Sequence, residues 1–129
     1  MDKYPHILLI DDNKTTIHLN KMVIEKVEKS VEVLTAPDGK AALEILKERE
    51  LEGSPFPKLI FVDLKMPAMD GLEFFENFKD LFRSRLADTK VVMLTTSLNQ
   101  EDLKKATAAG IRHYLNKPLT TNKVKEVFA

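Results

Sequence analysis

Four side chains that could act together follow three separate runs of mostly apolar residues. Asp11 and Asp12 directly follow the first run, Asp63 follows the second, and Lys117 follows a third, more mixed run. If these runs are neighbouring parallel strands, all four side chains meet at one edge of one sheet. Clustered carboxylates repel each other and are costly to keep ionised unless a cation lies among them. A hard divalent metal with oxygen ligands would balance these charges, and the lysine indicates that an anion joins them.

Two further segments bring polar groups to the same edge. Thr95, Thr96 and Ser97 follow another apolar run and place hydroxyls and backbone amides where an anion could be held. The segment DLKMPAMDG, from Asp63 to Gly71, is a turn-rich loop whose Pro and Gly should bring backbone groups back over Asp63. Other interpretations stay open, because each Asp could be a solvated loop residue or a helix cap, and Thr96 or Ser97 could cap a helix. For Thr95, the first residue off a central strand, we favour a role in the site.

The composition excludes several classes of protein. The 129 residues fit one domain with a sizeable core, and the 20 basic and 20 acidic residues cancel, so bulk charge does not indicate a nucleic-acid binder. The absence of cysteine excludes disulfides, thiolate catalysis and cysteine-based zinc sites, and His6, His18 and His113 show no metal-ligand spacing. The longest apolar runs have only four or five residues. We therefore expect neither a signal peptide nor a membrane span. The expected protein is soluble and cytoplasmic.

Strand and helix signals alternate along the chain. Unbroken apolar runs are typical of central strands covered on both faces, and mixed runs of edge strands. The expected strands are His6–Ile10, Glu32–Ala36, Lys58–Val62, Lys90–Leu94 and Arg112–Leu115. The first helix should span roughly Lys14–Lys29, and the fourth should stop at Gly110. The residues expected on the apolar faces of the five helices are Leu19, Val23, Val27, Ala41, Ala42, Ile45, Leu46, Phe74, Phe75, Phe78, Leu81, Phe82, Leu103, Ala106, Ala109, Val124, Val127 and Phe128.

This alternation predicts an α/β fold, a doubly wound five-stranded parallel sheet with right-handed crossovers and helices on both faces, in a single domain over residues 1–129. Sheets of this kind bind ligands beyond the carboxyl ends of their strands, at the point where the strand order switches. The candidate carboxylates and Lys117 would all lie at that edge. The long connection Leu51–Pro57 should lie at the opposite edge and have a structural role.

Taken together, these motifs resemble the receiver domain of response regulators in two-component signalling. The resemblance rests on Asp11-Asp12, the stretch DLKMPAMDG from Asp63, Thr95 after VVML, and YLNKP from Tyr114, in this order over almost the whole chain. It implies the flavodoxin-like strand order 2-1-3-4-5 and a stand-alone regulator of the chemotaxis type, without an output domain. It also implies a cis peptide bond between Lys117 and Pro118.

The resemblance implies that Asp63 accepts a phosphoryl group from a phosphohistidine on a sensor histidine kinase or a histidine phosphotransfer protein. Asp12, Asp63 and the backbone carbonyl of Lys65 would bind Mg²⁺ directly, and Asp11 would do so mainly through water. A carboxylate is a competent nucleophile for this transfer, and it yields a labile acyl phosphate that water reverses slowly. We therefore expect a self-phosphorylating switch rather than a turnover enzyme.

The same resemblance assigns the remaining contacts to the phosphoryl group. The side chains of Lys117 and Thr95 and the backbone of Lys65 and Thr96 would contact its oxygens, which neutralises their charge. Lys65 and Ser97 occupy positions that tune dephosphorylation in this family, so their identity sets a lifetime that the sequence does not give.

Thr95 and Tyr114 would form the switch. When the phosphoryl group draws the Thr95 hydroxyl inward, the Tyr114 ring could move from a solvent-facing to a buried position and change the surface of the fourth helix, fifth strand and fifth helix. We hypothesise that this face, including Lys104, Arg112 and His113, contacts a downstream protein or a second copy of the chain upon phosphorylation. The alternative is that Tyr114 merely covers the sheet edge. Neither a nucleic acid nor a membrane is an expected partner.

Three other functions compete with this one. A phosphatase of the haloacid dehalogenase type needs a second Asp two residues after its nucleophile, where this chain has Lys65. A flavodoxin-like electron carrier shares the fold, but the chain has no tryptophan and no phosphate-binding loop after its first strand, where Asp11-Asp12 would repel a flavin phosphate. A receiver used as a constitutive scaffold stays open, although each residue that the chemistry needs is present.

Overall fold

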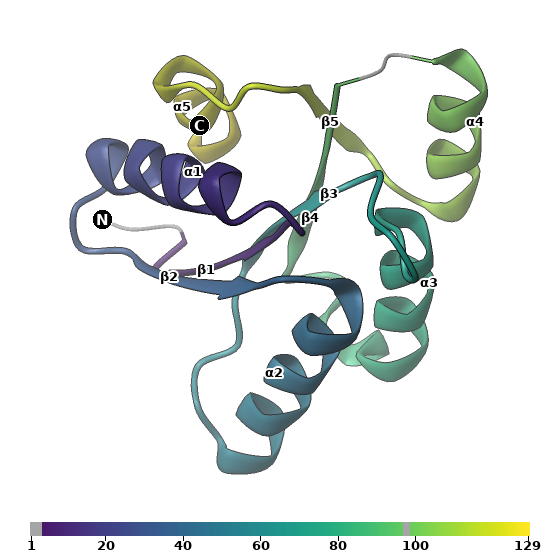
Figure 1. The fold of residues 1–129 in the computed structure, drawn as a ribbon. Helices are drawn as coiled ribbons and strands as arrows, with labels where there is room; N and C mark the ends of the chain where they lie inside the picture. The colour runs from purple at the N-terminus through teal and green to yellow at the C-terminus, as the bar shows by residue number, and fades with distance from the viewer. Residues whose placement is uncertain (1–3, 97–98) are drawn as a thin grey trace.

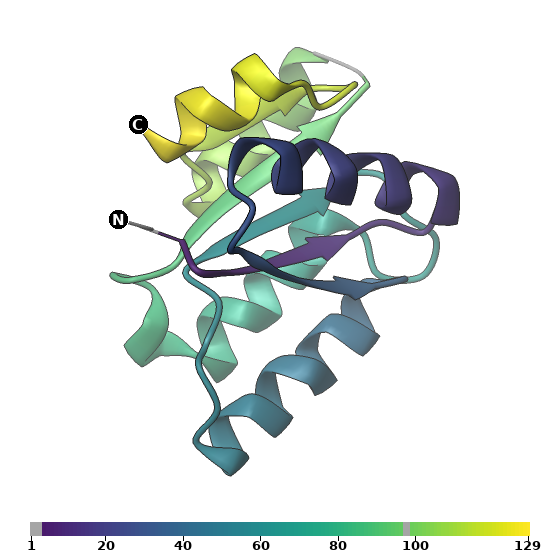
Figure 2. The same ribbon diagram turned by 90° about the vertical axis from the view of Figure 1, so that its left-hand side faces the viewer.

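Five short parallel strands form one sheet in the computed structural model, which describes residues 4–96 and 99–129 (Figures 1 and 2). The strands are β1 (His6–Ile10), β2 (Glu32–Ala36), β3 (Leu59–Asp63), β4 (Lys90–Thr95) and β5 (His113–Asn116). Their order is β2-β1-β3-β4-β5, and each neighbouring pair is parallel. The fold class and the strand order expected from the sequence are both confirmed.

Helices cover both faces of this sheet. They are α1 (Lys14–Val27), α2 (Gly39–Glu52), α3 (Gly71–Leu81), α4 (Gln100–Ala109) and α5 (Thr121–Phe128), with a short 3₁₀ turn, η1 (Arg83–Arg85), after α3. Helices α1 and α5 pack side by side on one face, whereas α2, α3 and α4 follow one another across the other (Figures 1 and 2). None of these helices in the described part of the chain is long and apolar enough to cross a membrane.

The apolar strands divide the core into two layers because successive side chains of a strand point to opposite faces. Leu8, Ile60 and Met93 lie in the layer under α2 and α3, and Ile7 and Phe61 lie in the layer under α1 and α5. Helix α3 supplies an aromatic stripe to the first layer, whose members are Phe74, Phe75, Phe78 and, just after the helix, Phe82. The strands that carry the candidate site are thus held from both sides.

Two helical positions differ from the expected pattern. Leu19 is 54% exposed and Leu81 is 49% exposed, although both were expected to face the core. In α1, Asn20 and Ile24 are buried instead. Val23 and Val27, the later members of the run, do pack against the core, because a four-residue spacing drifts around a helix of 3.6 residues per turn and only part of the run lies on the buried face.

Several element boundaries also differ. Helix α1 ends at Val27 rather than Lys29, and α2 continues to Glu52, so the connection to β3 begins at Gly53, where φ is 70°. Strand β5 is displaced by one residue towards the site. The connection lies at the amino-terminal end of β3, away from the carboxylates, as expected.

Candidate functional site

Three carboxylates meet at the carboxyl ends of β1 and β3. Asp11, Asp12 and Asp63 each offer an oxygen, and these oxygens lie within 4.8 Å of one another. Asp11 and Asp63 are buried, with 3% and 7% of their surface exposed, whereas Asp12 is exposed. The two strands are adjacent and parallel, so their carboxyl ends lie side by side although they are far apart in the sequence.

Lys117 reaches this cluster from the far end of β5. Its ammonium nitrogen lies 2.9 Å from Oδ2 of Asp11 and 3.2 Å from Oδ2 of Asp63. Its backbone N–H donates to the Thr95 carbonyl over 2.8 Å, which continues the pairing of β5 with β4. The peptide bond between Lys117 and Pro118 is cis, as the resemblance to receiver domains implies.

Burial affects the pKa values of both Asp63 and Lys117. Burial raises the pKa of the Asp63 carboxyl above its ordinary value, Lys117 opposes this shift, and the charge of Asp11 adds to it. Burial acts to lower the pKa of the Lys117 ammonium, but the hydrogen bond to Asp11 and the charges of Asp63 and Asp11 outweigh it, so the pKa of Lys117 is raised. One lysine therefore does not fully balance the acidic cluster.

The donor set fits a hard divalent cation. Oxygen ligands are those that Mg²⁺ prefers, and Mg²⁺ is usually held by one or two carboxylates while it keeps several waters. Asp12 provides such an oxygen at the solvent side, and Asp63 and Asp11 provide buried ones. Burial keeps the pKa of Asp63 raised despite Lys117, and a further positive charge nearby would favour the ionised carboxylate.

The loop after β3 folds back over Asp63, as its Pro and Gly indicate. The Lys65 N–H donates to Oδ1 of Asp63 over 3.3 Å, and the Gly71 N–H donates to the Leu64 carbonyl over 3.0 Å. A Cβ atom on Gly71 would lie 2.6 Å from the Asp63 carbonyl oxygen, so only glycine fits this close approach. Asp70 then caps α3 in a reciprocal pair with Glu73.

The loop is also tied to α4 by an ion pair that the sequence analysis did not predict. The Lys65 ammonium lies 3.2 Å from Oδ2 of Asp102, in the first turn of α4. Lys65 thus connects Asp63 with α4: its backbone N–H bonds to Asp63, and its side chain pairs with Asp102. No sequence signal identifies this partner, because the contact depends on how far the two side chains reach and not on the ends of neighbouring strands.

The residues after β4 complete the edge. Thr95 is the last residue of β4, is 1% exposed and lies beside Asn116 of β5 in the register. Thr96 is exposed and lines a cavity of about 420 Å³ together with Lys117 and Pro118. Ser97, which the sequence analysis also placed here, lies outside the described residues.

Tyr114 is half-buried and packs against the core layer under α2 and α3, so it does not face solvent freely in this structure. Its hydroxyl contacts the Thr107 hydroxyl and lies 3.3 and 3.2 Å from the carbonyl oxygens of Leu103 and Ile111, either of which can accept its single hydrogen. The ring is therefore tethered to α4 and to the turn that follows it.

Residues 7–129 match the family described as the response regulator receiver domain. A protein of Methanothrix harundinacea, named as the probable methanogenesis regulatory protein FilR2, is 34% identical over 119 residues, which are 92% of this chain and 76% of that protein.

Solved structures agree with this assignment. The crystal structure of a two-component response regulator from Cytophaga hutchinsonii has a TM-score of 0.86 and 31% identity, and the match covers 95% of this chain and 92% of that one. The phosphorylated cyanobacterial phytochrome response regulator RcpA has a TM-score of 0.77 and 28% identity, over 97% of this chain and 89% of that one. With the family match spanning nearly the whole sequence, the chain belongs to the response regulator receiver domains of two-component signalling.

Proposed function

We propose that the chain is a phosphorylation switch in which Asp63 receives a phosphoryl group from a phosphohistidine of a sensor kinase or a histidine phosphotransfer protein. The observation that carries the proposal is the convergence of Asp11, Asp12 and Lys117 on Asp63. The phosphorylated crystal structure of RcpA, a relative by fold and sequence, supports it. In this proposal the chain acts in the cytoplasm and is not a turnover enzyme.

The residues divide the chemistry among them. An oxygen of the Asp63 carboxylate attacks phosphorus, the phosphorus–nitrogen bond breaks, and the imidazole leaves with the electron pair. Lys117 lies close enough to Asp63 to follow the transferred oxygens and neutralise their charge. Asp11 accepts a hydrogen bond from the Lys117 ammonium over 2.9 Å and so holds it beside Asp63. Bound Mg²⁺, held by Asp11, Asp12, Asp63 and the Lys65 carbonyl, would supply further positive charge to the same oxygens.

Backbone groups and Thr95 would complete the phosphoryl contacts. The Lys65 N–H already donates to Asp63. In the proposal, the Thr96 backbone makes a second contact with the phosphoryl oxygens. The Thr95 side chain is buried at the end of β4, next to the strand that carries Asp63. The Lys65 N–H faces Asp63 before the donor arrives, so this contact needs little reorganisation during transfer.

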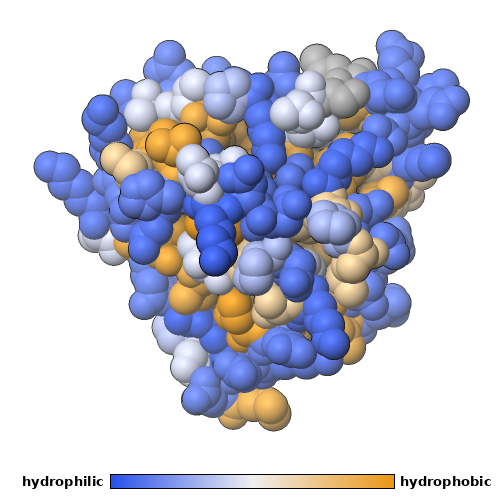
Figure 3. Space-filling model, viewed as in Figure 1, coloured by the Kyte–Doolittle hydropathy of each residue, from blue (hydrophilic) through white to orange (hydrophobic). Residues whose placement is uncertain are grey.

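The donor would dock on α1 beside the site. Leu19 and Met22 are exposed apolar side chains on this helix, and Leu19 lines the cavity that also contains Lys117 and Thr96. Figure 3 shows apolar side chains near α1, and others over α2, on a face that is mostly hydrophilic. An apolar patch next to a reactive carboxylate suits a protein donor better than a small one.

The output would leave through Tyr114 and α4. Movement of the Thr95 hydroxyl towards a phosphoryl group would change the packing around Tyr114, whose hydroxyl holds Leu103 and Thr107 of α4. The proposed output surface is the face formed by α4, β5 and α5, where a downstream protein or a second copy would bind. Of the residues expected on this surface, Lys104 lies on α4, and Arg112 and His113 lie at the start of β5, where they also line a groove.

The test is incubation with acetyl phosphate and Mg²⁺, followed by intact mass spectrometry. The parent protein should gain the mass of one phosphoryl group, and Asp63→Asn should gain none. Asp70→Asn is a matched control, because Asp70 is an aspartate of the same loop that caps α3 instead of facing Lys117. A phosphoryl group that persists in Asp63→Asn would overturn the assignment of the acceptor.

A further inference from the structure

A second concave site lies at the end of the sheet opposite Asp63. A groove of about 730 Å³ runs past the amino-terminal ends of β4 and β5. Lys90, which lines it, precedes Thr95 by five residues along β4, so the groove lies roughly 17 Å from the phosphorylation edge. None of its lining residues belongs to the site described above.

The groove carries positive charge that the described parts of the chain do not neutralise. No carboxylate lies within 4.0 Å of the ammonium of Lys90 or the guanidinium of Arg112 among residues 4–96 and 99–129. Lys90 donates to the Val127 carbonyl over 3.1 Å and lies 5.6 Å from the centre of the Tyr4 ring, which orients it without removing its charge. Asp88, an acidic residue that also lines the groove, forms no ion pair within 4.0 Å among the described residues.

The basic groups are close enough to influence one another. Burial lowers the pKa of His113, and the charges of Lys90 and Arg112 lower it further. Lys90 and His113 lie on one face of the sheet, because Val92 is the register partner of His113, and Arg112 projects from the opposite face. The positive charge therefore follows the sheet edge from one face to the other.

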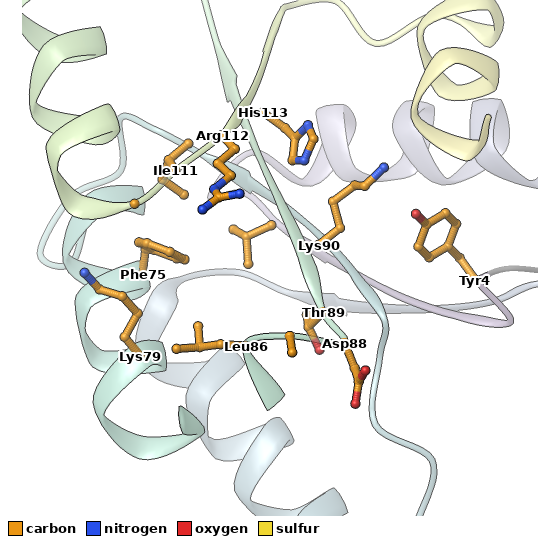
Figure 4. A pocket seen from close by; sticks show the side chains of 13 residues that line it. Tyr4, Phe75, Lys79, Leu86, Asp88, Thr89, Lys90, Ile111, Arg112 and His113 are labelled. Carbon is orange, nitrogen blue, oxygen red and sulfur yellow. The ribbon is translucent and has the colours of Figure 1, made fainter. Parts of the chain in front are cut away.

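The floor of the groove is apolar. Leu86 is 36% exposed there, and Phe75, Val91 and Ile111 close the groove from below. Figure 4 shows the lining side chains spread in a row, with Phe75 and Lys79 at one end, Tyr4 at the other, and Arg112 and Lys90 between them. Cationic groups at intervals along a groove suit an extended occupant with several negative charges better than a compact one.

We propose that this groove binds an extended acidic segment of a partner protein, with an apolar side chain of that segment over Leu86 and its carboxylates on Arg112 and Lys90. Arginine can bind a carboxylate through two parallel hydrogen bonds, which gives the contact direction as well as charge. Since the groove and Asp63 lie at opposite ends of the sheet, binding here leaves the phosphorylation edge accessible. The groove would hold a partner in both states of the switch.

The experiment measures fluorescence anisotropy of a labelled peptide that contains two aspartates, a leucine and two glutamates in sequence. Arg112→Glu should weaken binding at least about tenfold, because it reverses one partner of the charge pair. Lys47→Glu, the same charge reversal on the exposed side of α2, should leave binding unchanged. A beryllofluoride complex of the protein should bind the peptide as the free protein does, and Arg112→Glu should still be phosphorylated by acetyl phosphate.

Several results would overturn the proposal. Equal binding of the peptide to the parent and to Arg112→Glu would place the peptide elsewhere. Equal binding of a peptide with asparagine and glutamine in place of the acids would remove the role of charge. Displacement by tripolyphosphate at concentrations far below those of an unlabelled acidic peptide would assign the groove to a small phosphate ligand rather than a protein segment.

Discussion

Gly71→Ala should damage both the stability of the protein and its phosphorylation. The added Cβ would lie 2.6 Å from the Asp63 carbonyl oxygen and 2.7 Å from Sδ of Met93, whereas ordinary contacts begin near 3.4 Å. The loop must therefore move by about 0.8 Å relative to the strand that carries Asp63. Overpacking of this kind costs about 1–3 kcal/mol, and alanine in a helix returns up to about 1 kcal/mol relative to glycine.

The expected net loss of about 1–2 kcal/mol corresponds to a fall in Tm of about 4–8 °C for a domain of this size. Displacement of a reacting group by nearly an ångström can reduce a rate by up to about a hundredfold, so phosphorylation by acetyl phosphate should slow at least about tenfold. The measurements are thermal unfolding and the rate of mass gain.

Gly53→Ala is the matched control for this variant. Gly53 has a φ of 70° and no atom within 4 Å of an added Cβ, so alanine there should cost about 1 kcal/mol through backbone strain alone. It lies at the far end of the sheet and should leave the phosphorylation rate unchanged. If Gly71→Ala reacts as fast as the parent, the loop does not position Asp63 in the way described.

Three further predictions concern the charged groups. Lys117→Met should lower the free energy of unfolding of the metal-free protein by about 3–5 kcal/mol in urea titrations, because Asp11 and Asp63 lose the cation that they share. An unchanged midpoint would contradict this. The pKa of Asp63 is raised in the folded state, so its ionisation costs stability as the pH rises, and Asp63→Asn should be more stable than the parent at neutral pH. The extra stability of Asp63→Asn should vanish as the pH falls below 3.8, the ordinary pKa of an aspartate. If the extra stability instead grew in acid, the pKa of Asp63 would be lowered by folding and not raised. Asp12→Ala should weaken Mg²⁺ binding in calorimetric titrations more than Asp11→Ala does, since Asp11 already bonds Lys117, and the opposite order would mean that the ligand set is wrong.

The fold could be predicted from the sequence because its signals are local. The apolar runs of β1, β3 and β4 indicate buried strands, and Gly110, at a φ of 110°, ends α4 as expected. Residues at the border of a helix's apolar face were less predictable, and Leu19 shows why. Its exposure depends on how α1 rotates against the sheet, which the spacing of apolar residues fixes only to within one residue.

The site could be predicted in its main parts because the topology brings strand ends together. Asp11, Asp63 and Lys117 were placed at one edge by the alternation of strands and helices alone, and their contacts agree. Contacts that depend on side-chain reach were not predicted. The pair Lys65–Asp102 and the tether of Tyr114 to α4 join segments whose separation only the folded structure gives.

The central claim is that Asp63 carries the phosphoryl group, and borohydride trapping tests it most directly. An acyl phosphate is reduced by borohydride to an alcohol, so protein treated with acetyl phosphate and Mg²⁺ should yield homoserine in place of aspartate at position 63. Peptide mapping by tandem mass spectrometry should find this change at Asp63 and not at Asp11 or Asp12, which lie in the same cluster. Reduction at either of those residues, or at none of the three in protein that has gained the phosphoryl mass, would contradict the account.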